Sequence, residues 1–406
     1  KTGEKSVAGS GTLGGIVGSL EVEGKTGAII DCVNNATIIG GHAETTEKAT
    51  IGGIFGKVGA TKLVAEMTVR DCRNNGTLQQ ITDGPVGGII GEIARVKVIT
   101  VENCENYGSI TAASNIGGIV GYLDFGASGA QEFVLRGCLN AADITASGDR
   151  VGGMIGFADR WLQPVSVISC ANKGNITGAN YVGGIIGYSA TTESRGQLIT
   201  VLNTMVLGNV TATGNYAGLV AGSLMTRDTN SILQITNSLF VGNVTAANYA
   251  AALLGGVVRA IGTKVTTTET KLTVTGSFVK ATVSVSAGAQ TAIFLAGSET
   301  PEITNVTVTV ENSRFAVTLM QDGTAVTDPK AYYTGDGTGV SQALTALGED
   351  ELADGTVQAL LNEYAKANNL MIWYQGGTTP ELRAFYIKPA DITNERDLSH
   401  GYTGEA

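Results

Sequence analysis

All five cysteines of the chain fall at the same position of a recurring pattern. They are Cys32, Cys72, Cys104, Cys138 and Cys170, and the series continues with Thr204, Ser238, Ser277 and Ser313. Because serine and threonine replace cysteine in the later copies, the position predicts a small inward slot. No CxxC or His–Cys spacing supports a metal site, and stacked strands place neighbouring thiols awkwardly for a disulfide. We therefore expect buried free thiols that pack as small apolar groups, with no metal and no cofactor.

Outward carboxylates on neighbouring strands are the groups that a polysaccharide-cleaving enzyme needs. We compared the outward-facing residues of the strand that leads to each cysteine position. Among them, only Glu102 and Arg136 place an acid and a base in adjacent copies. We interpret them as a surface ion pair. The two histidines, His42 and His400, have no partner at the spacing of a metal site or a catalytic triad. The sequence therefore predicts no catalytic residue and a protein that is not an enzyme.

Aromatic residues recur on both sides of a glycine-framed core phrase. Those on its far side are Tyr122, Phe157 and Tyr188, and those before it are Tyr181, Tyr216 and Tyr249. Such rows stack on sugar rings or brace neighbouring coils, and bracing is the favoured interpretation. Trp161, alone in a longer connection, is the best single candidate for an exposed contact. The candidate ligand-binding residues are therefore Trp161, Tyr181, Tyr216 and Tyr249.

Up to residue 255, the glycine-framed phrase itself returns every 30 to 38 residues. Its copies lie at residues 14–18, 52–56, 87–91, 117–121, 152–156 and 183–187, with looser copies at 217–221, 251–255 and 292–296. A period of this size indicates stacked repeats. The two apolar residues of each phrase are expected to face opposite sides of one strand, one in the core and one under the following connection. The glycines are expected to let another backbone approach closely.

Each period also contains two short runs rich in Val, Ile and Thr, such as residues 99–104 and 108–111. The residue before each cysteine position is of a corner-forming type. Two residues after the cysteines stand Asn34, Asn74, Asn106, Asn140 and Asn172, which predicts a ladder of stacked amides. Stacked copies bury faces that one copy cannot. We predict an all-β fold, a parallel β-solenoid of about eight to nine coils over residues 1–325, well formed to about residue 260 and degenerate after it.

These elements resemble the GLUG repeat family of large bacterial surface proteins. The shared features are the G-[LIM]-[VIF]-G core, the Cys-x-Asn-x-Gly corner at residues 104–108 and 170–174, and the strand that follows. The resemblance covers roughly residues 11–260 and decays through about residue 320. It implies an adhesin-like or accessory role in which the repeat has no catalytic function. The HExxH motif of GLUG-bearing proteases does not occur in this sequence, so their activity is not implied.

Residues 326–406 are predicted to form a small C-terminal α/β cap, similar to the tail that closes such arrays in anaerobic Gram-negative surface proteins. Val357, Leu360, Leu361 and Tyr364 follow the spacing of one apolar helix face, with Thr356 as the N-cap. We expect one helix near residues 356–368. Together with Trp373, this helix is expected to seal the last coil, whose strand edges would otherwise be open.

Composition narrows the range of partners. The net charge of −10 argues against nucleic acid and anionic membrane surfaces. No apolar run approaches the length of a membrane-spanning helix. An export signal, an anchor or an upstream domain is expected outside residues 1–406.

These observations favour a non-catalytic bacterial cell-surface protein, adhesin-like or a scaffold, that displays a solenoid to an extracellular host protein or glycan. We expect it to be extracellular or anchored in the outer membrane. Two alternatives stay open. One is an accessory module that binds carbohydrate or assists polysaccharide processing, and the other is a passive stalk for an upstream domain.

Overall fold

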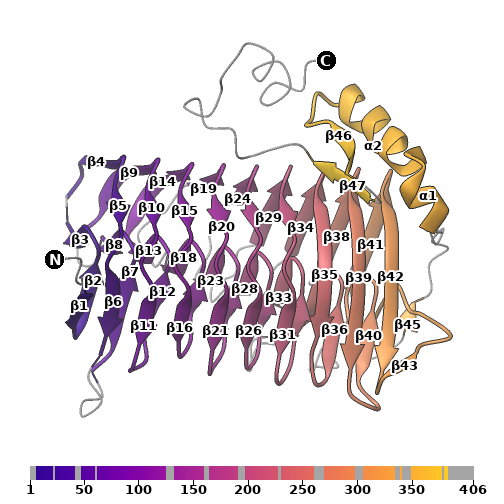
Figure 1. Cartoon of the computed structure of the whole chain (residues 1–406), viewed down its shortest axis with the longest axis horizontal. Helices are drawn as coiled ribbons and strands as arrows, with labels where there is room; N and C mark the ends of the chain where they lie inside the picture. The colour runs from indigo at the N-terminus through magenta and orange to yellow at the C-terminus, as the bar shows by residue number, and fades with distance from the viewer. Residues whose placement is uncertain are drawn as a thin grey trace.

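The computed structural model describes residues 6–21, 23–41, 47–59, 62–124, 132–159, 164–190, 197–226, 230–259, 269–297, 305–333, 339–340, 349–376 and 379–382. These residues form a parallel β-solenoid of about eight turns, so the predicted fold class is confirmed. The turns stack along the long axis, and two short helices lie at the end opposite the N-terminus (Figure 1).

Four parallel sheets, here called A to D, run along the stack. Sheet A contains β1 (Ser6–Gly9), β5 (Val33–Asn34), β6 (Thr37–Gly40), β10 (Arg73–Asn74), β11 (Leu78–Gln80), β15 (Glu105–Asn106), β16 (Ile110–Ala112), β20 (Leu139–Asn140), β21 (Ile144–Ala146), β25 (Ala171–Asn172), β26 (Ile176–Gly178), β30 (Met205–Val206), β31 (Val210–Ala212), β35 (Leu239–Thr245), β39 (Phe278–Val285) and β42 (Arg314–Gln321). Sheet B contains β2 (Gly11–Gly14), β7 (Ala49–Gly52), β12 (Val86–Gly87), β17 (Ile116–Gly117), β22 (Val151–Gly152), β27 (Val182–Gly183), β32 (Ala217–Gly218), β36 (Tyr249–Ala251) and β40 (Gln290–Ala292). Sheet C contains β3 (Val17–Leu20), β8 (Phe55–Val58), β13 (Ile90–Ala94), β18 (Val120–Asp124), β23 (Ile155–Asp159), β28 (Ile186–Ser189), β33 (Ala221–Thr226) and β37 (Leu254–Arg259). Sheet D contains β4 (Thr26–Ile30), β9 (Val64–Arg70), β14 (Val96–Glu102), β19 (Glu132–Arg136), β24 (Val165–Ile168), β29 (Gln197–Leu202), β34 (Ser231–Thr236), β38 (Glu269–Thr275) and β41 (Asn305–Glu311).

The corner between sheets D and A is made by one residue per turn in the left-handed backbone region. The corner residues, with φ between 46° and 62°, are Asp31, Asp71, Asn103, Gly137, Ser169, Asn203, Asn237, Gly276 and Asn312. Asn, Asp and Gly tolerate this conformation best, which explains their recurrence. The predicted corner is confirmed, and it turns the following Cys, Ser or Thr inward.

The glycine phrase forms a second corner, between sheets B and C, rather than the single strand that we expected. In residues 182–187, β27 ends at Gly183 and β28 begins at Ile186. Because the chain bends between the two strands, Ile185 and Ile186 both enter the same core and are fully buried. The looser copy is also displaced by one residue, since Gly218 lies opposite Gly183 and the phrase spans residues 218–222.

The predicted amide ladder is confirmed, and it packs directly against the glycine corner. From Asn34 to Asn172, the Nδ2 of each amide donates to the Oδ1 of the next at 2.7 to 2.9 Å. A Cβ atom on Gly88, the second glycine of its phrase, would lie only 2.5 Å from Cγ of Asn106. The amide ladder and the pair of glycines also end close together along the stack. Val206 and Phe240 occupy the amide position in the following turns, and Leu219 occupies the position of the second glycine. An amide with both a donor and an acceptor can repeat along a stack in this way.

The C-terminal elements pack on the outer face of sheet A, in a cluster that runs from Leu139 to Ala316 of the last coil, so they cover a flank of several turns and not the last coil alone. Helices α1 (Glu349–Ala353) and α2 (Thr356–Ala367) and the hairpin of β46 (Trp373–Gly376) and β47 (Thr379–Leu382) pack on outward residues of sheet A. The outward position that holds Arg73 and Glu105 in early turns becomes Met205, Leu239 and Phe278, which need an apolar cover. Trp373 is buried there, and its Nε1 donates to Oδ1 of Asn237 at 2.7 Å.

Two details of the predicted helix differ. The N-cap residue is Gly355, with φ of 84°, and Asp354 Oδ1 accepts a hydrogen bond from the Thr356 amide at 2.8 Å. The buried stripe consists of Val357, Leu361 and Ala365, whereas Leu360 is 38% exposed. The helix contacts the sheet along one narrow line, so residues spaced by four are buried and Leu360 is not.

The chain that follows the last turn covers part of it, while β41 ends sheet D and pairs only with β38 among the described residues. The backbone amides of Ile293 and Phe294 donate to the carbonyls of Lys330 and Ala331 at 3.0 and 2.8 Å. Strand β43 (Thr324–Ala325) folds back antiparallel on β42, and β44 (Tyr332–Tyr333) pairs with β45 (Gly339–Val340). Parallel pairing continues through β41 and β42, well beyond residue 260.

We predict that Gly184→Val lowers the free energy of unfolding by about 3 kcal/mol through overpacking. A Cβ at Gly184 would lie 2.3 Å from the Leu219 carbonyl oxygen and 2.7 Å from Val206 Cγ1. Urea unfolding measures the change, and Gly9→Ala is the matched control because its new Cβ meets only Leu13 Cδ2 at 3.5 Å. A parent-like midpoint for Gly184→Val would refute this packing.

Candidate functional site

Six aromatic rings lie in one continuous row across sheets B and C. Tyr122, Phe157 and Tyr188 share one register position in sheet C. Tyr181 and Tyr216 take the left-handed conformation just before their sheet B strands, with φ of 57° and 66°, and Tyr249 opens β36. Parallel stacking places each ring above its counterpart, about 4.8 Å away along the axis.

The rings of this aromatic row stack on one another. The centroid distances are 5.2 Å for Tyr122–Phe157, 5.5 Å for Phe157–Tyr188, 4.6 Å for Tyr188–Tyr181, 5.4 Å for Tyr181–Tyr216 and 4.8 Å for Tyr216–Tyr249. Each such pair contributes about 0.5 to 1.5 kcal/mol beyond the area that it buries. The row therefore braces at least five successive coils.

The predicted ligand-binding residues divide into three groups. Tyr216 is fully buried between Tyr181 and Tyr249, so its ring faces are occupied by protein. Tyr181 and Tyr249 are half-buried, and ligand binding by them stays a prediction. Trp161 lies outside the described residues.

Arg150 joins this row, and the sequence analysis missed it. Its guanidinium lies 4.7 Å from the ring centroid of Phe157 and 6.0 Å from that of Tyr188. Its NH1 donates to Asn115 Oδ1 at 3.3 Å, while no described atom accepts from its buried Nε. The signal was present in the sequence, because Arg150 precedes its core phrase just as Tyr181 does.

A carboxylate lies on the same row. The hydroxyl of Tyr122 donates to Asp159 Oδ2 at 3.1 Å, and Asp159 closes β23 two residues after Phe157. Rings, a guanidinium and a carboxylate are thus grouped on the outer side of the B–C corner. Such a group can bind a sugar ring by stacking and its hydroxyls by hydrogen bonds, or bind a polar peptide.

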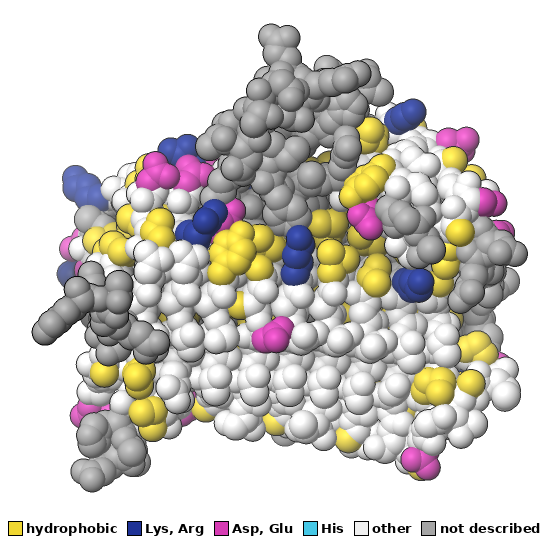
Figure 2. Space-filling model, in the orientation of Figure 1, with side chains coloured by type: hydrophobic (Ala, Val, Ile, Leu, Met, Phe, Trp, Pro, Cys, Tyr) yellow, Lys and Arg dark blue, Asp and Glu magenta, His cyan; other side chains and the backbone are white. Residues whose placement is uncertain are grey.

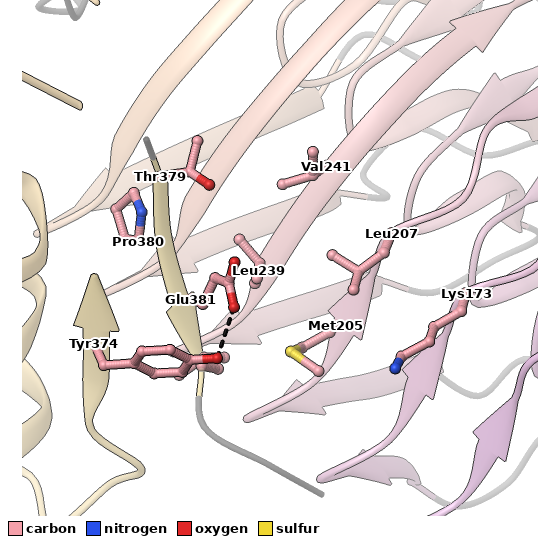
Figure 3. A pocket seen from close by; sticks show the side chains of 10 residues that line it. Lys173, Met205, Leu207, Leu239, Val241, Tyr374, Thr379, Pro380 and Glu381 are labelled. Atoms are coloured by element: carbon pink, nitrogen blue, oxygen red, sulfur yellow. Dashed lines mark hydrogen bonds between the residues drawn. The ribbon is translucent and has the colours of Figure 1, made fainter. Parts of the chain in front are cut away.

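A cavity of about 340 Å³ lies where the C-terminal hairpin meets the solenoid (Figure 3). Met205, Leu207, Leu239 and Val241 form its apolar wall on sheet A. The opposite wall comes from the hairpin, where the Tyr374 hydroxyl donates to Glu381 Oε2 at 2.6 Å. On the face seen in Figure 2, hydrophobic side chains gather beside the C-terminal elements, and charged ones are sparse over the middle of the stack.

The five thiols are free, as predicted, but they serve as more than small apolar groups. The amide of Cys104 donates to Cys138 Sγ at 3.4 Å, and the amide of Cys138 donates to Cys170 Sγ at 3.5 Å. Further along, the amides of Cys170 and Thr204 donate to Thr204 Oγ1 and Ser238 Oγ. The corner turns these amides away from the sheet, so the position needs an acceptor. That need explains why Cys, Ser and Thr exchange with one another there.

The expected ion pair between Glu102 and Arg136 is not formed. The two residues are in register on β14 and β19, but the ion pairs among the described residues do not join them. Opposite charges meet elsewhere, at Lys57–Glu92 and Arg73–Glu105, both at 2.6 Å. Both of these pairs join neighbouring turns of the stack.

No protein-family model matches the chain, and no curated protein or solved structure matches it significantly. Among the described residues, no group of three or more His, Cys, Asp and Glu side chains is placed to hold a metal ion. No described helix is long and apolar enough to cross a membrane.

We predict that stability falls with rising pH because of the buried thiol of Cys138. Burial raises the pKa of this thiol well above its usual value, so it stays protonated in the fold. In the unfolded chain thiols ionise near pH 8.5. The stability that this buried, protonated thiol contributes is therefore complete below that pH and is lost progressively above it. Between pH 7 and pH 10 we expect a loss of about 2 kcal/mol from this group. Urea unfolding of the parent and of Cys138→Ser measures it, and equal pH dependence of the two would contradict the assignment.

Proposed function

We propose that the chain is a non-catalytic, adhesin-like scaffold of a bacterial cell surface that presents its outer faces to a host protein or glycan. The observation that carries this proposal is the difference between the inward and the outward side chains. Inward Cys, Asn, Ser and Thr residues bond from coil to coil, and Arg150 with its neighbouring rings forms an outward cluster. A rigid stack with a localised polar and aromatic surface suits display and binding.

The surface chemistry supports binding more than catalysis. Two of the outward carboxylates, Glu92 and Glu105, are paired with Lys57 and Arg73. A glycosidase needs two carboxyl groups facing one scissile bond, about 5 to 10 Å apart. Each of these two carboxylates faces a cation of the neighbouring turn and not a second carboxylate, which suits a stabilising role.

A second candidate is an accessory carbohydrate-binding module. The half-buried rings of Tyr122, Phe157 and Tyr181 beside Arg150 favour it, because aromatic faces and a guanidinium are common means of holding sugars. The third possibility, a passive stalk, predicts that none of these residues affects binding.

We predict that microbeads coated with the chain adhere to cultured epithelial cells more strongly than albumin-coated beads. Arg150→Ala should reduce adhesion at least fivefold because it removes the cation from the aromatic row. Arg136→Ala, an exposed arginine away from the row, is the matched control and should not change adhesion. Adhesion at the albumin level for the parent chain would contradict the adhesin-like function and favour the stalk.

Treating the cells with trypsin or with glycosidases identifies the class of receptor. A glycan array probed with the parent, Arg150→Ala and Trp161→Ala then separates the two binding candidates. A saturable signal that either variant abolishes favours the carbohydrate-binding module.

A further inference from the structure

The guanidinium of Arg150 has no carboxylate partner among the described residues. None of the ion pairs that these residues form involves Arg150. Its NH1 donates to the neutral amide oxygen of Asn115 at 3.3 Å, and no described atom accepts from its buried Nε. The side chain is nonetheless half-buried. A charge that is partly removed from water gains from an opposite charge, so this guanidinium suits an anionic ligand.

Two carboxylates in the same turn as Arg150 bind other groups. Asp159 Oδ2 accepts a hydrogen bond from the Tyr122 hydroxyl at 3.1 Å. Asp149 Oδ1 accepts from the backbone amide of Asn180 at 3.1 Å and from Asn180 Nδ2 at 2.9 Å. Both acids are therefore held by hydrogen bonds to neighbouring turns, while Arg150 contacts aromatic rings and a neutral amide.

Aromatic packing fixes the orientation of this guanidinium. It lies 4.7 Å from the ring centroid of Phe157 and 6.0 Å from that of Tyr188. The Phe157 ring is itself stacked between Tyr122 and Tyr188. A guanidinium packed over a ring keeps its N–H groups in its own plane, where a carboxylate can accept two parallel hydrogen bonds. The site thus favours a carboxylate over a neutral hydroxyl.

The neighbouring turns supply groups that suit a sugar ring. Asn115 and Tyr181 hold the position of Arg150 in the turns before and after it, because each precedes an in-register strand of sheet B. All three take the left-handed conformation, with φ of 58°, 65° and 57° in chain order. The line from amide to guanidinium to phenol is spaced by about 4.8 Å per turn. A carboxylate on Arg150 therefore places the rest of its ligand beside an aromatic ring and polar groups. These match the C–H faces and hydroxyls of a sugar better than an acidic peptide side chain.

We propose that Arg150 is the anion-binding centre of a carbohydrate site whose ligand is a sugar ring with a carboxylate, as in uronic acids. The carboxylate accepts two hydrogen bonds from the terminal nitrogens of Arg150, and the sugar ring lies against Tyr181. The inference rests on the proposed binding function, and it narrows the ligand of that function to an acidic glycan.

Two methyl glycosides test the need for the carboxylate. Methyl β-glucuronide carries a carboxylate where methyl β-glucoside carries a neutral hydroxymethyl group. Titration of the full chain with each sugar, followed by ligand-observed NMR, gives the two dissociation constants. We expect the glucuronide to bind the parent about tenfold more tightly, because hydrogen bonds to charged groups are stronger than neutral ones.

Three variants locate this preference. Arg150→Gln should abolish it, and Arg136→Gln, which changes an exposed arginine of sheet D, should keep it. Asn115→Asp should also abolish it, because the new carboxylate keeps the Oδ1 that accepts from Arg150 and neutralises the guanidinium. Asp tolerates the left-handed conformation of this position, so this variant tests the charge without removing the arginine. Urea unfolding of each variant shows whether it is folded.

Equal binding of the two glycosides to the parent would overturn the inference, and so would a preference that survives in both Arg150→Gln and Asn115→Asp. Acetate that binds as tightly as the glucuronide would also overturn it, because the sugar ring then contributes nothing. A tetraglutamate peptide that binds more tightly than the glucuronide would overturn it as well, since the carboxylate then belongs to a protein partner. Coated beads that adhere to cells without any glucuronide binding would overturn this inference alone and leave the adhesin-like function standing.

Discussion

Every residue in a parallel in-register stack lies directly above its own counterpart, about 4.8 Å away, and the rest of this structure depends on that constraint. A side chain is tolerated at a ladder position only if it can pack against itself. An asparagine amide meets this demand because it carries both a donor and an acceptor, and the chain from Asn34 to Asn172 uses both. Opposite charges also meet it, since Lys57 faces Glu92 and Arg73 faces Glu105.

The same constraint links elements that are distant in the sequence. The amide of Asn106 fills the space left by Gly88, and the corner at Asn103 directs the Cys104 amide toward the sulfur of the next turn. Where Phe240 replaces the amide, the bend of sheet A is lost and β35 runs as one strand of seven residues. In the earlier turns the local bond from Asn106 Nδ2 to the Gly108 carbonyl spans the bend, which persists between β30 and β31 where Val206 takes the amide position. Arg150 lies outside these ladders, against the rings of Phe157 and Tyr188.

Repetition made the fold and its ladders predictable from sequence. One recurring spacing predicts the cysteine and asparagine series, the D–A corner and the parallel sheets. It does so because each repeat carries the same residue types at the same positions. The features that we did not predict correctly are those for which the repeat pattern carries no information. The bend inside the glycine phrase cannot be read from two adjacent isoleucines such as Ile185 and Ile186. Arg150 was missed because it occurs in a single turn. The contact of the cap with a flank was not predicted, because its partners Met205, Leu239 and Phe278 lie at an outward position that holds Arg73 and Glu105 in earlier turns.

The most direct test of this account is the unfolding free energy of Asn106→Leu, measured by urea titration beside Val206→Leu. The first variant removes the amide from the middle of the ladder, whereas the second alters volume at the same register position without breaking a hydrogen bond. We expect Asn106→Leu to lower the free energy of unfolding by about 3 kcal/mol, since the amides of Asn74 and Asn140 each lose a buried partner. We expect a clearly smaller loss for Val206→Leu. An Asn106→Leu stability within about 0.5 kcal/mol of the parent would contradict the claim that the amide ladder holds the coils in register.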